Sequence, residues 1–151
     1  MVVVIAAVLV YMSVRFLAPL EAQAFQQAER LRNDVRHIQM LALTWNQPLR
    51  LTVATSTRYE VCCLNAAMTA CTTGAAPCGA NPVVDPATGR SFRVDLESGL
   101  TVSGTSPLEF DKLGRPCNGA ALRTAAVTLT IGGSSARNVV IAPITGFASV
   151  Q

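Results

Sequence analysis

The apolar residues in the first third of the chain follow two different patterns. Residues 2–18 are apolar apart from Ser13 and Arg15. In residues 20–46, apolar positions instead recur at alternating spacings of three and four, which predicts a helix with one apolar face. Pro19 lies between the two patterns and removes one backbone hydrogen bond, so we expect a helix kink there rather than a helix end.

Together the two stretches predict one helix of roughly 45 residues, about 65–70 Å long at 1.5 Å per residue. A helix of that length cannot fit inside a domain of about 100 residues, so its first half should project. We therefore assign residues 1–24 to a transmembrane or assembly half and residues 25–151 to a folded domain. The side chains expected to contact lipid or other subunits are Val2, Val3, Val4, Ile5, Val8, Leu9, Val10, Val14, Phe16 and Leu17. Those expected to pack the rear half on a sheet are Ala28, Leu31, Val35, Ile38, Ala42 and Trp45.

After Pro48 the apolar period changes to two. Leu49, Leu51 and Val53 alternate with polar residues, which is typical of a strand with one buried face. Similar segments are SFRVDL, GLTVSG, PLEFD, AVTLTIGG, RNVVIAP and FASV, separated by turn-rich sequences. A segment at about 65–90 is too long for an ordinary connection and is expected to be a variable loop. The whole pattern predicts an α+β fold, with the long N-terminal helix packed on an antiparallel sheet.

Composition and charge narrow the environment of the protein. Half of the residues are hydrophobic, 14% are charged, and the net charge of +3 comes almost entirely from scattered arginines. This distribution forms no basic stripe of the kind that binds nucleic acid. The five cysteines behind an apolar N-terminus favour an oxidising compartment and disulfide bonds.

The cysteine spacing allows more than one disulfide pattern. Cys71 and Cys78 flank a turn-rich stretch, so we expect a short-range bridge between them. Cys117 would then pair with Cys62 or Cys63. Those two are adjacent and point to opposite faces of a strand, so only one of them can easily meet Cys117. One thiol would be left over, buried as a small hydrophobic side chain.

Candidate chemistry is sparse. There is no CxxC pair, and His37 is the single histidine, placed on the exposed side or edge of the predicted helix. The sequence therefore favours neither a zinc site nor a catalytic triad. The carboxylates Asp95, Glu97, Glu109 and Asp111 fall at alternate strand positions, as solvent-facing side chains would. The glycines form no nucleotide-binding loop. We expect a protein that is not an enzyme, with no catalytic residue, cofactor, metal or small-molecule substrate.

Three interpretations compete for the apolar N-terminus. A cleavable signal peptide is supported by the small-x-small form of residues 22–24, but no basic region precedes the apolar run. A plain single-pass anchor fits the run, yet does not explain why the helix continues as an amphipathic stripe. A helix that is retained and reused in assembly explains both features. Its apolar half can exchange lipid for the helices of neighbouring subunits, and apolar surface stays buried in either environment.

Several segments resemble one family of filament subunits. VVVIAAVLVYMSVRFLAP is similar to the class III N-terminus of type IV pilins and pseudopilins. LRNDVRHIQMLALTWNQPLRLTV resembles the passage from helix to first strand in GspH/FimT-like minor pilins. EFDKLGRPC and NVVIAPITGFASV are similar to the C-terminal half of that family, and resemble most the minor pilins of mannose-sensitive haemagglutinin (MSHA) pili. The resemblance covers nearly the whole chain apart from the loop at 65–90.

This resemblance implies a pilin-like fold and a structural role. It implies a minor pilin or pseudopilin held in the inner membrane by a single helix, with its domain in the periplasm or in an extracellular filament. Its partners would be other pilin or pseudopilin subunits and the inner membrane. A type II secretion pseudopilin is the main alternative. A FimT-like DNA-binding subunit is a weaker one, because residues 145–151 carry no basic side chain and phosphate contacts supply most affinity for DNA.

The beginning of the chain departs from the family pattern. Family members start with a short basic leader ending in Gly, followed by a Phe-Thr-Leu-x-Glu opening, and neither is present in this sequence. We therefore expect Met1 not to be the natural start. The methylated first residue and the acidic fifth residue of the family cannot be assigned to any position of this chain.

Overall fold

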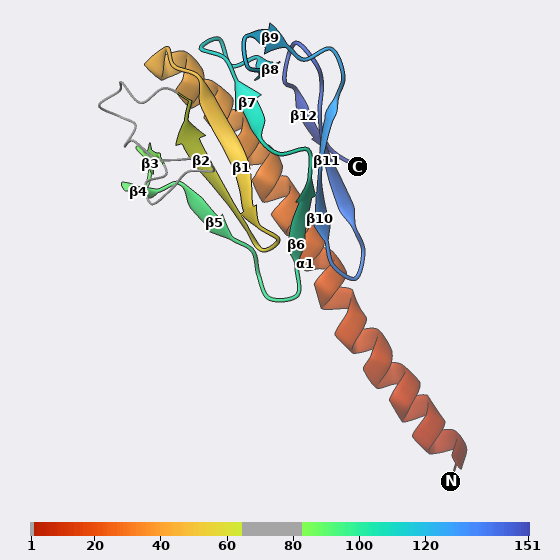
Figure 1. Cartoon of the computed structure of the whole chain (residues 1–151). Coiled ribbons are helices and arrows are strands. Elements are labelled where there is room, and N and C mark those ends of the chain that lie inside the picture. The colour runs from red at the N-terminus through yellow and green to blue at the C-terminus, as the bar shows by residue number, and fades with distance from the viewer. Residues whose placement is uncertain (1, 65–82) are drawn as a thin grey trace.

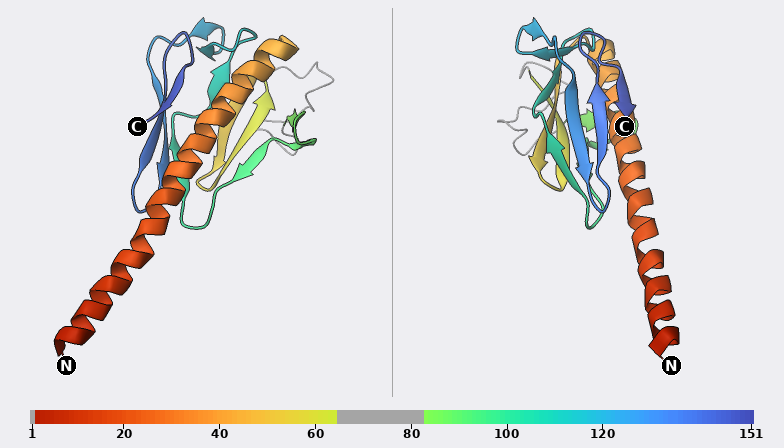
Figure 2. Two further views of the ribbon diagram at one scale, coloured as in Figure 1. Left: turned by 180° about the vertical axis from the view of Figure 1, so that it is seen from behind. Right: turned by 90° about the vertical axis from the view of Figure 1, so that its right-hand side faces the viewer.

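The computed structural model describes residues 2–64 and 83–151, with side chains from Glu21 onward within those ranges. One long helix, α1 (Val2–Trp45), opens the chain and continues without a break through Pro19. Its N-terminal half extends away from the strands, as Figures 1 and 2 show. Where side chains are described, we find no helical segment with the length and apolar character needed to cross a membrane.

Local backbone geometry ends α1 just before the first strand. Asn46 has a positive φ of 52°, a left-handed conformation that asparagine tolerates well. The Gln47 N–H then donates to the Ala42 carbonyl at 3.0 Å, and the Asn46 N–H to the Leu43 carbonyl at 3.2 Å. These bonds satisfy carbonyls that the last helical turn leaves open. Pro48 cannot continue a helix, so the chain turns directly into β1.

The strands form two main antiparallel sheets and one small hairpin. The first sheet has the order β5 (Arg93–Asp95), β2 (Arg58–Cys63), β1 (Leu49–Thr55), β7 (Leu108–Phe110), β8 (Pro116–Asn118), β9 (Ala121–Leu122). The second has the order β12 (Ala148–Val150), β11 (Arg137–Ile141), β10 (Val127–Gly132), β6 (Thr101–Gly104). The hairpin joins β3 (Val84–Asp85) to β4 (Arg90–Ser91). The predicted α+β class is confirmed, whereas the apolar pattern did not indicate the division into separate sheets.

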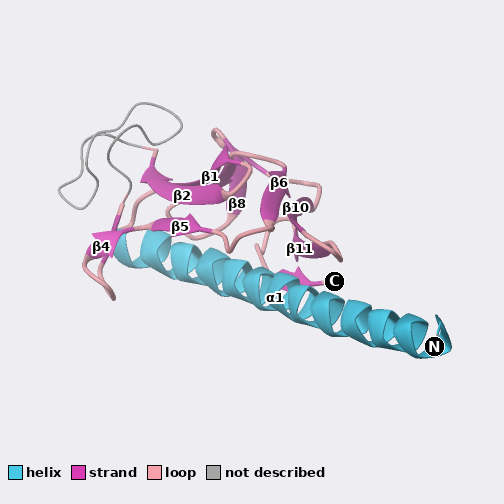
Figure 3. Cartoon of the chain, turned by 90° about the horizontal axis from the view of Figure 1, so that it is seen from below, coloured by secondary structure: helices cyan, strands magenta, loops and turns pink. Residues whose placement is uncertain are grey.

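The rear half of α1 packs against both main sheets, and Figure 3 shows most of the strands along one side of the helix. Trp45 is partly buried at the helix end. Strand residues with alternate burial complete the core, as in β10, where Val127, Leu129 and Ile131 point inward. The helix residues that are fully buried are Ala24, Ala28, Leu31, Val35, Ile38 and Ala42.

The cysteines differ from the expected arrangement. Cys117 is a free, buried thiol, whereas Cys62 and Cys63 are both disulfide-bonded. The expected pairing of Cys117 with Cys62 or Cys63 is therefore wrong. The physical reason is sheet order: β8 lies three strands from β2, roughly 14 Å at about 4.8 Å per strand, which no disulfide spans. The expected bridge between Cys71 and Cys78 lies outside the described residues.

Candidate functional site

One edge of α1 is hydrogen-bonded to two turns of the β domain. Gln39 Nε2 donates to the Gly114 carbonyl at 2.8 Å and to the Thr145 carbonyl at 3.3 Å. Gly114 and Gly146 have positive φ angles, which would strain any other residue, and both pack closely against Gln39. A Cβ at Gly146 would overlap Gln39 Nε2, and one at Gly114 would lie 3.0 Å from the Gln39 carbonyl oxygen. This contact holds the turn after β7 and the turn after β11 against the same point of the helix.

A second contact on this edge lies one helical turn earlier. Arg36 Nη2 donates to the Ala148 carbonyl at 3.4 Å, and its guanidinium lies over the Phe147 ring, 5.4 Å from the centroid. A guanidinium over an aromatic face is attracted by the ring quadrupole. The start of β12 is therefore attached to α1 by both polar and cation–π contacts.

Five large apolar side chains are exposed on the segments that these contacts join, namely α1 and the turns after β7 and β11. Each of the five is more than half exposed. Such groups on the surface of a small domain mark a surface for a partner or a membrane when they gather on contacting segments. We name them the distal apolar patch, because they lie toward the end of α1 that is far from the N-terminus: Met40, Leu43, Leu113, Ile144 and Phe147.

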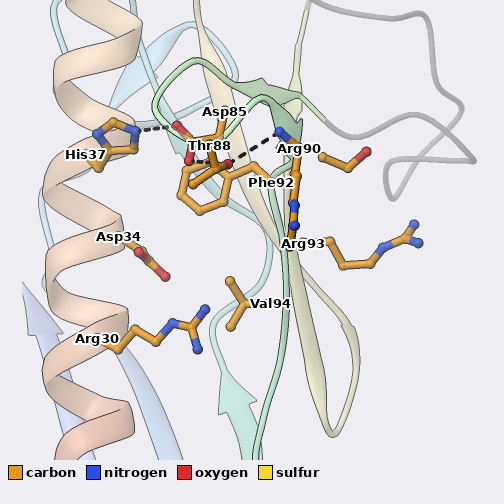
Figure 4. Close-up of a pocket in the computed structure, with 10 residues that line it drawn as sticks. Arg30, Asp34, His37, Asp85, Thr88, Arg90, Phe92, Arg93 and Val94 are labelled. Atoms are coloured by element: carbon orange, nitrogen blue, oxygen red, sulfur yellow. Dashed lines mark hydrogen bonds and ion pairs between the residues drawn. The ribbon is translucent and has the colours of Figure 1, made fainter.

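On the opposite edge of α1, a histidine contacts the β3–β4 hairpin. His37 Nε2 lies 3.0 Å from Asp85 Oδ1 on β3, and the His37 ring lies 5.7 Å from that of Phe92 (Figure 4). Asp85 also accepts bonds from the Ala87 N–H and the Thr88 hydroxyl. Burial pushes the pKa of Asp85 up, but the Ala87 N–H together with His37 and Thr88 outweighs burial and leaves the pKa below its usual value. The carboxylate therefore favours its charged form in this contact, which we call the His37–Asp85 clasp.

A half-buried acid, Asp34, lies one turn earlier on the same edge. The Tyr59 hydroxyl donates to the Asp34 carboxylate. Burial raises the pKa of Asp34 above its ordinary value, although the Tyr59 hydroxyl and the charge of Arg30 oppose the rise. Burial and the neighbouring Asp34 carboxylate likewise raise the pKa of Tyr59. These groups connect α1 to β2 and leave the hydroxyl protonated.

Two ion pairs in the first sheet have buried carboxylates and arginines that still reach solvent. Glu60 accepts from Arg93 at 2.7 Å, and Glu109 lies 3.1 Å from Arg50 on the neighbouring strand. The expectation that Glu109 faces solvent is wrong, because it lies on an interior strand where the Gly119 N–H also caps its carboxylate. Among the described residues, no three His, Cys, Asp or Glu side chains gather as metal ligands would.

The His37–Asp85 clasp leads to a prediction about stability and pH. Asp85 has a lower pKa in the folded chain than in the unfolded one, so its charge stabilises the fold above pH about 4, and this contribution is lost as the pH falls through the lower folded-state value. We expect His37→Ala to weaken that contribution. It should also speed amide hydrogen exchange at Phe92, whose N–H bonds to the Val83 carbonyl beside the hairpin.

Arg58→Ala is the matched control for this prediction. Its ion pair with Asp95 is exposed, and exposed pairs contribute little. Unchanged exchange at Phe92 in His37→Ala, measured above and below pH 4, would mean that the clasp does not hold the hairpin.

Comparison with known proteins gives matches among solved structures alone, since no family model and no curated protein matches the chain. The minor pseudopilin EpsH from the type 2 secretion system of Vibrio cholerae is 14% identical, with a TM-score of 0.58, over 85% of this chain and 96% of that one. The type IV minor pilin FimU of Pseudomonas aeruginosa is 13% identical, with a TM-score of 0.56, over 87% of this chain and 88% of that one. The chain has a pilin-like fold. At this identity the likeness concerns the fold, which is the one that the sequence resemblance implied.

Within the pilin-like fold, the sequence-predicted residues fall into two groups. The stripe from Ala28 to Trp45 lies at the interface between α1 and the sheets. The residues expected to contact lipid, from Val2 to Leu17, belong to the projecting half of α1, whose side chains are not described.

Sequence reasoning missed the edges of the helix. Asp85 lay in a segment expected to be a variable loop, and nothing in its spacing connected it with His37. The exposed Ile144 and Phe147 were treated as parts of strand and turn. Ile144 and Phe147 are large apolar residues on either side of Thr145 and Gly146, in a turn that should be polar, and this was the signal that could have found them.

Proposed function

We propose that this chain is a structural minor pilin or pseudopilin subunit that assembles through the projecting half of α1. The observation that carries the proposal is that this apolar half-helix extends beyond the strands of its own domain, which leave it uncovered. The helix extends beyond the strands, and its residues 2–18 are apolar with two exceptions. Water is an unfavourable environment for such a surface, so it needs lipid or the helices of other subunits.

The distal apolar patch supports the same proposal from the other end of α1. A filament subunit needs one surface for the neighbour on each side, because head-to-tail assembly uses two different patches. The projecting half-helix supplies one apolar surface, and Met40, Leu43 and their neighbours supply another. We infer that both are covered in the assembled state.

The proposed location is the inner membrane, crossed once by the N-terminal half-helix, with the β domain in the periplasm or in a filament. We propose an MSHA-type pilus as the assembly, and a type II secretion pseudopilus is the second candidate. The likeness to EpsH and to FimU is similar in TM-score, so the fold favours neither. DNA capture has less support, since Arg115 pairs with Asp111 and Arg123 donates to backbone carbonyls.

A charge in the projecting half-helix tests the proposal. Val8→Asp should move the full chain out of carbonate-washed membranes and reduce co-purification with neighbouring subunits, because a carboxylate near the bilayer centre costs about 2.5–3.5 kcal/mol. Met40→Asp is the matched control for membrane attachment, since it adds the same charge at a side chain 55% exposed on the same helix.

Equal membrane retention of Val8→Asp and the unchanged chain would contradict the anchoring role.

A truncation adds a second measurement. Ala24 is fully buried, so the boundary expected after residue 24 would remove a core side chain. A chain starting at Ala22 and exported with a foreign signal should instead be folded and released from membranes.

A further inference from the structure

A cleft of about 510 Å³ lies between α1 and the segment from Asp85 to Val94, on the edge of the helix opposite Arg36. Figure 4 looks into this cleft. One wall is helical and carries Arg30, Asp34 and His37. The facing wall belongs to the β3–β4 hairpin and β5. We call it the α1–β5 cleft.

The acidic side chains of the cleft already have hydrogen-bonding partners. Asp34 accepts the Tyr59 hydroxyl, and Asp85 is held by His37 and by the turn that follows it. One of the basic side chains is also neutralised, since Arg93 is paired with Glu60 at 2.7 Å. These bonds satisfy the hydrogen-bonding needs of both carboxylates, and Arg30 acts on Asp34 through its charge without forming an ion pair with it.

Two guanidinium groups remain. In the part of the chain that the structure describes, neither Arg30 nor Arg90 forms an ion pair. Figure 4 shows Arg30 extending from α1 toward the facing segment. Arg90 runs along that segment toward the level of Asp34, and Arg93 turns away from the helix. Two unpaired cations thus reach the cleft from opposite walls.

The rest of the lining favours one class of anion. A guanidinium donates two parallel N–H bonds and so matches a carboxylate or a phosphate. Asp34 and Asp85 border the same space and would repel a doubly charged phosphate more strongly than a singly charged carboxylate. Phe92 and Val94, although 7% and 4% exposed, line the same space and give its wall a small apolar surface for the methylene stem of an acidic side chain.

We propose that the α1–β5 cleft binds an acidic peptide segment of a partner protein, with Arg30 and Arg90 holding one carboxylate between them. This site is separate from the projecting half-helix and from the distal apolar patch. It gives the β domain a polar contact of its own, on the edge of α1 away from Phe147. The proposal does not require the chain to assemble in any particular filament.

The test uses the full chain in zwitterionic detergent micelles and follows the arginine Nε–H signals and the backbone amides by NMR. The probe is acetyl-Glu-Glu-amide, compared with acetyl-Gln-Gln-amide and with inorganic phosphate. We expect the glutamate peptide to shift the signals of Arg30, Arg90 and Phe92, and the glutamine peptide to leave them in place. Arg30→Gln and Arg90→Gln should each weaken binding about tenfold, the loss expected for one charge-assisted hydrogen-bonded pair.

Lys112→Gln is the matched control, because it removes one exposed positive charge in the turn after β7 and should leave the affinity unchanged. Backbone spectra of the variants establish that each remains folded. Equal binding of the glutamine peptide, or the same affinity in both arginine variants, would overturn the proposal. Phosphate binding that depends on Arg30 and Arg90, without binding of the glutamate peptide, would overturn the assignment to carboxylates.

Discussion

Replacement of Leu31 by alanine is expected to lower the free energy of unfolding by about 2–5 kcal/mol. Leu31 is fully buried where α1 crosses the sheets, so its loss removes apolar contacts and leaves a cavity that close-packed neighbours fill only in part. The measurement is chemical denaturation of the full chain in detergent, followed by the fluorescence of the single tryptophan, Trp45, which packs at the end of the same helix.

Met40→Ala on the same helix is the control for this expectation. Its side chain is 55% exposed, so truncation should change stability by no more than about 0.5 kcal/mol. Equal effects of the two substitutions would show that the interface between α1 and the sheets contributes little to the fold. The difference matters for function, because this interface is a main path, beside the covalent link to β1, by which a force on the projecting half of α1 reaches the β domain.

The features that the sequence predicted are those that a local period encodes. The 3.6-residue period placed the stripe from Ala28 to Ala42, and these side chains are buried because one face of a continuous helix meets the sheets. The period of two at Leu49, Leu51 and Val53 marked β1. The change of period after Pro48 marked the passage from helix to strand, since proline cannot continue a helix. None of these features depends on which distant segments meet.

The features that escaped sequence reasoning all depend on long-range pairing. The sheet order separates Cys117 from Cys62, and no spacing along the chain indicates that order. Glu109 is buried because its strand is interior, although the sequence Leu108-Glu109-Phe110 alternates in polarity as it would on a strand with one solvent-facing side. The α1–β5 cleft exists because the hairpin at residues 84–91 folds back to His37. Polar contacts between distant segments leave no periodic trace in a single sequence.

The two edges of α1 have different chemistry, and this asymmetry bears on how a subunit could be recognised. The edge beside β12 is apolar at its surface, with Phe147 and Ile144 exposed next to the helix. The edge beside β5 is polar, and its Arg30 and Arg90 form no ion pair with any side chain in residues 21–64 and 83–151. A neighbour that contacts α1 from one side therefore meets apolar surface, and one from the other side meets charge. In the proposed assembly, such a pattern would fix the orientation of a neighbour around α1, because placing an apolar partner surface on the charged edge would cost binding free energy.

Arg50→Met is expected to destabilise the fold by about 2–4 kcal/mol, because it leaves the Glu109 carboxylate buried without its cation. Arg50 and Glu109 are cross-strand partners of β1 and β7, and Glu109 is 7% exposed. The Gly119 N–H remains as a donor, and Arg50 is partly exposed to solvent, so the effect should stay below that of a fully buried pair. Denaturation followed by Trp45 fluorescence measures the loss.

The double variant Arg50→Met/Glu109→Leu separates the value of the pair from the penalty of an unpaired charge. Removing both partners leaves apolar side chains of similar size in a sheet interior, which is often close to neutral for stability. We therefore expect the double variant to recover most of the loss, whereas Glu109→Leu alone leaves Arg50 able to turn toward solvent and should cost less than Arg50→Met. A double variant as unstable as Arg50→Met would mean that the ion pair itself, and not the stranded carboxylate, stabilises this part of the sheet.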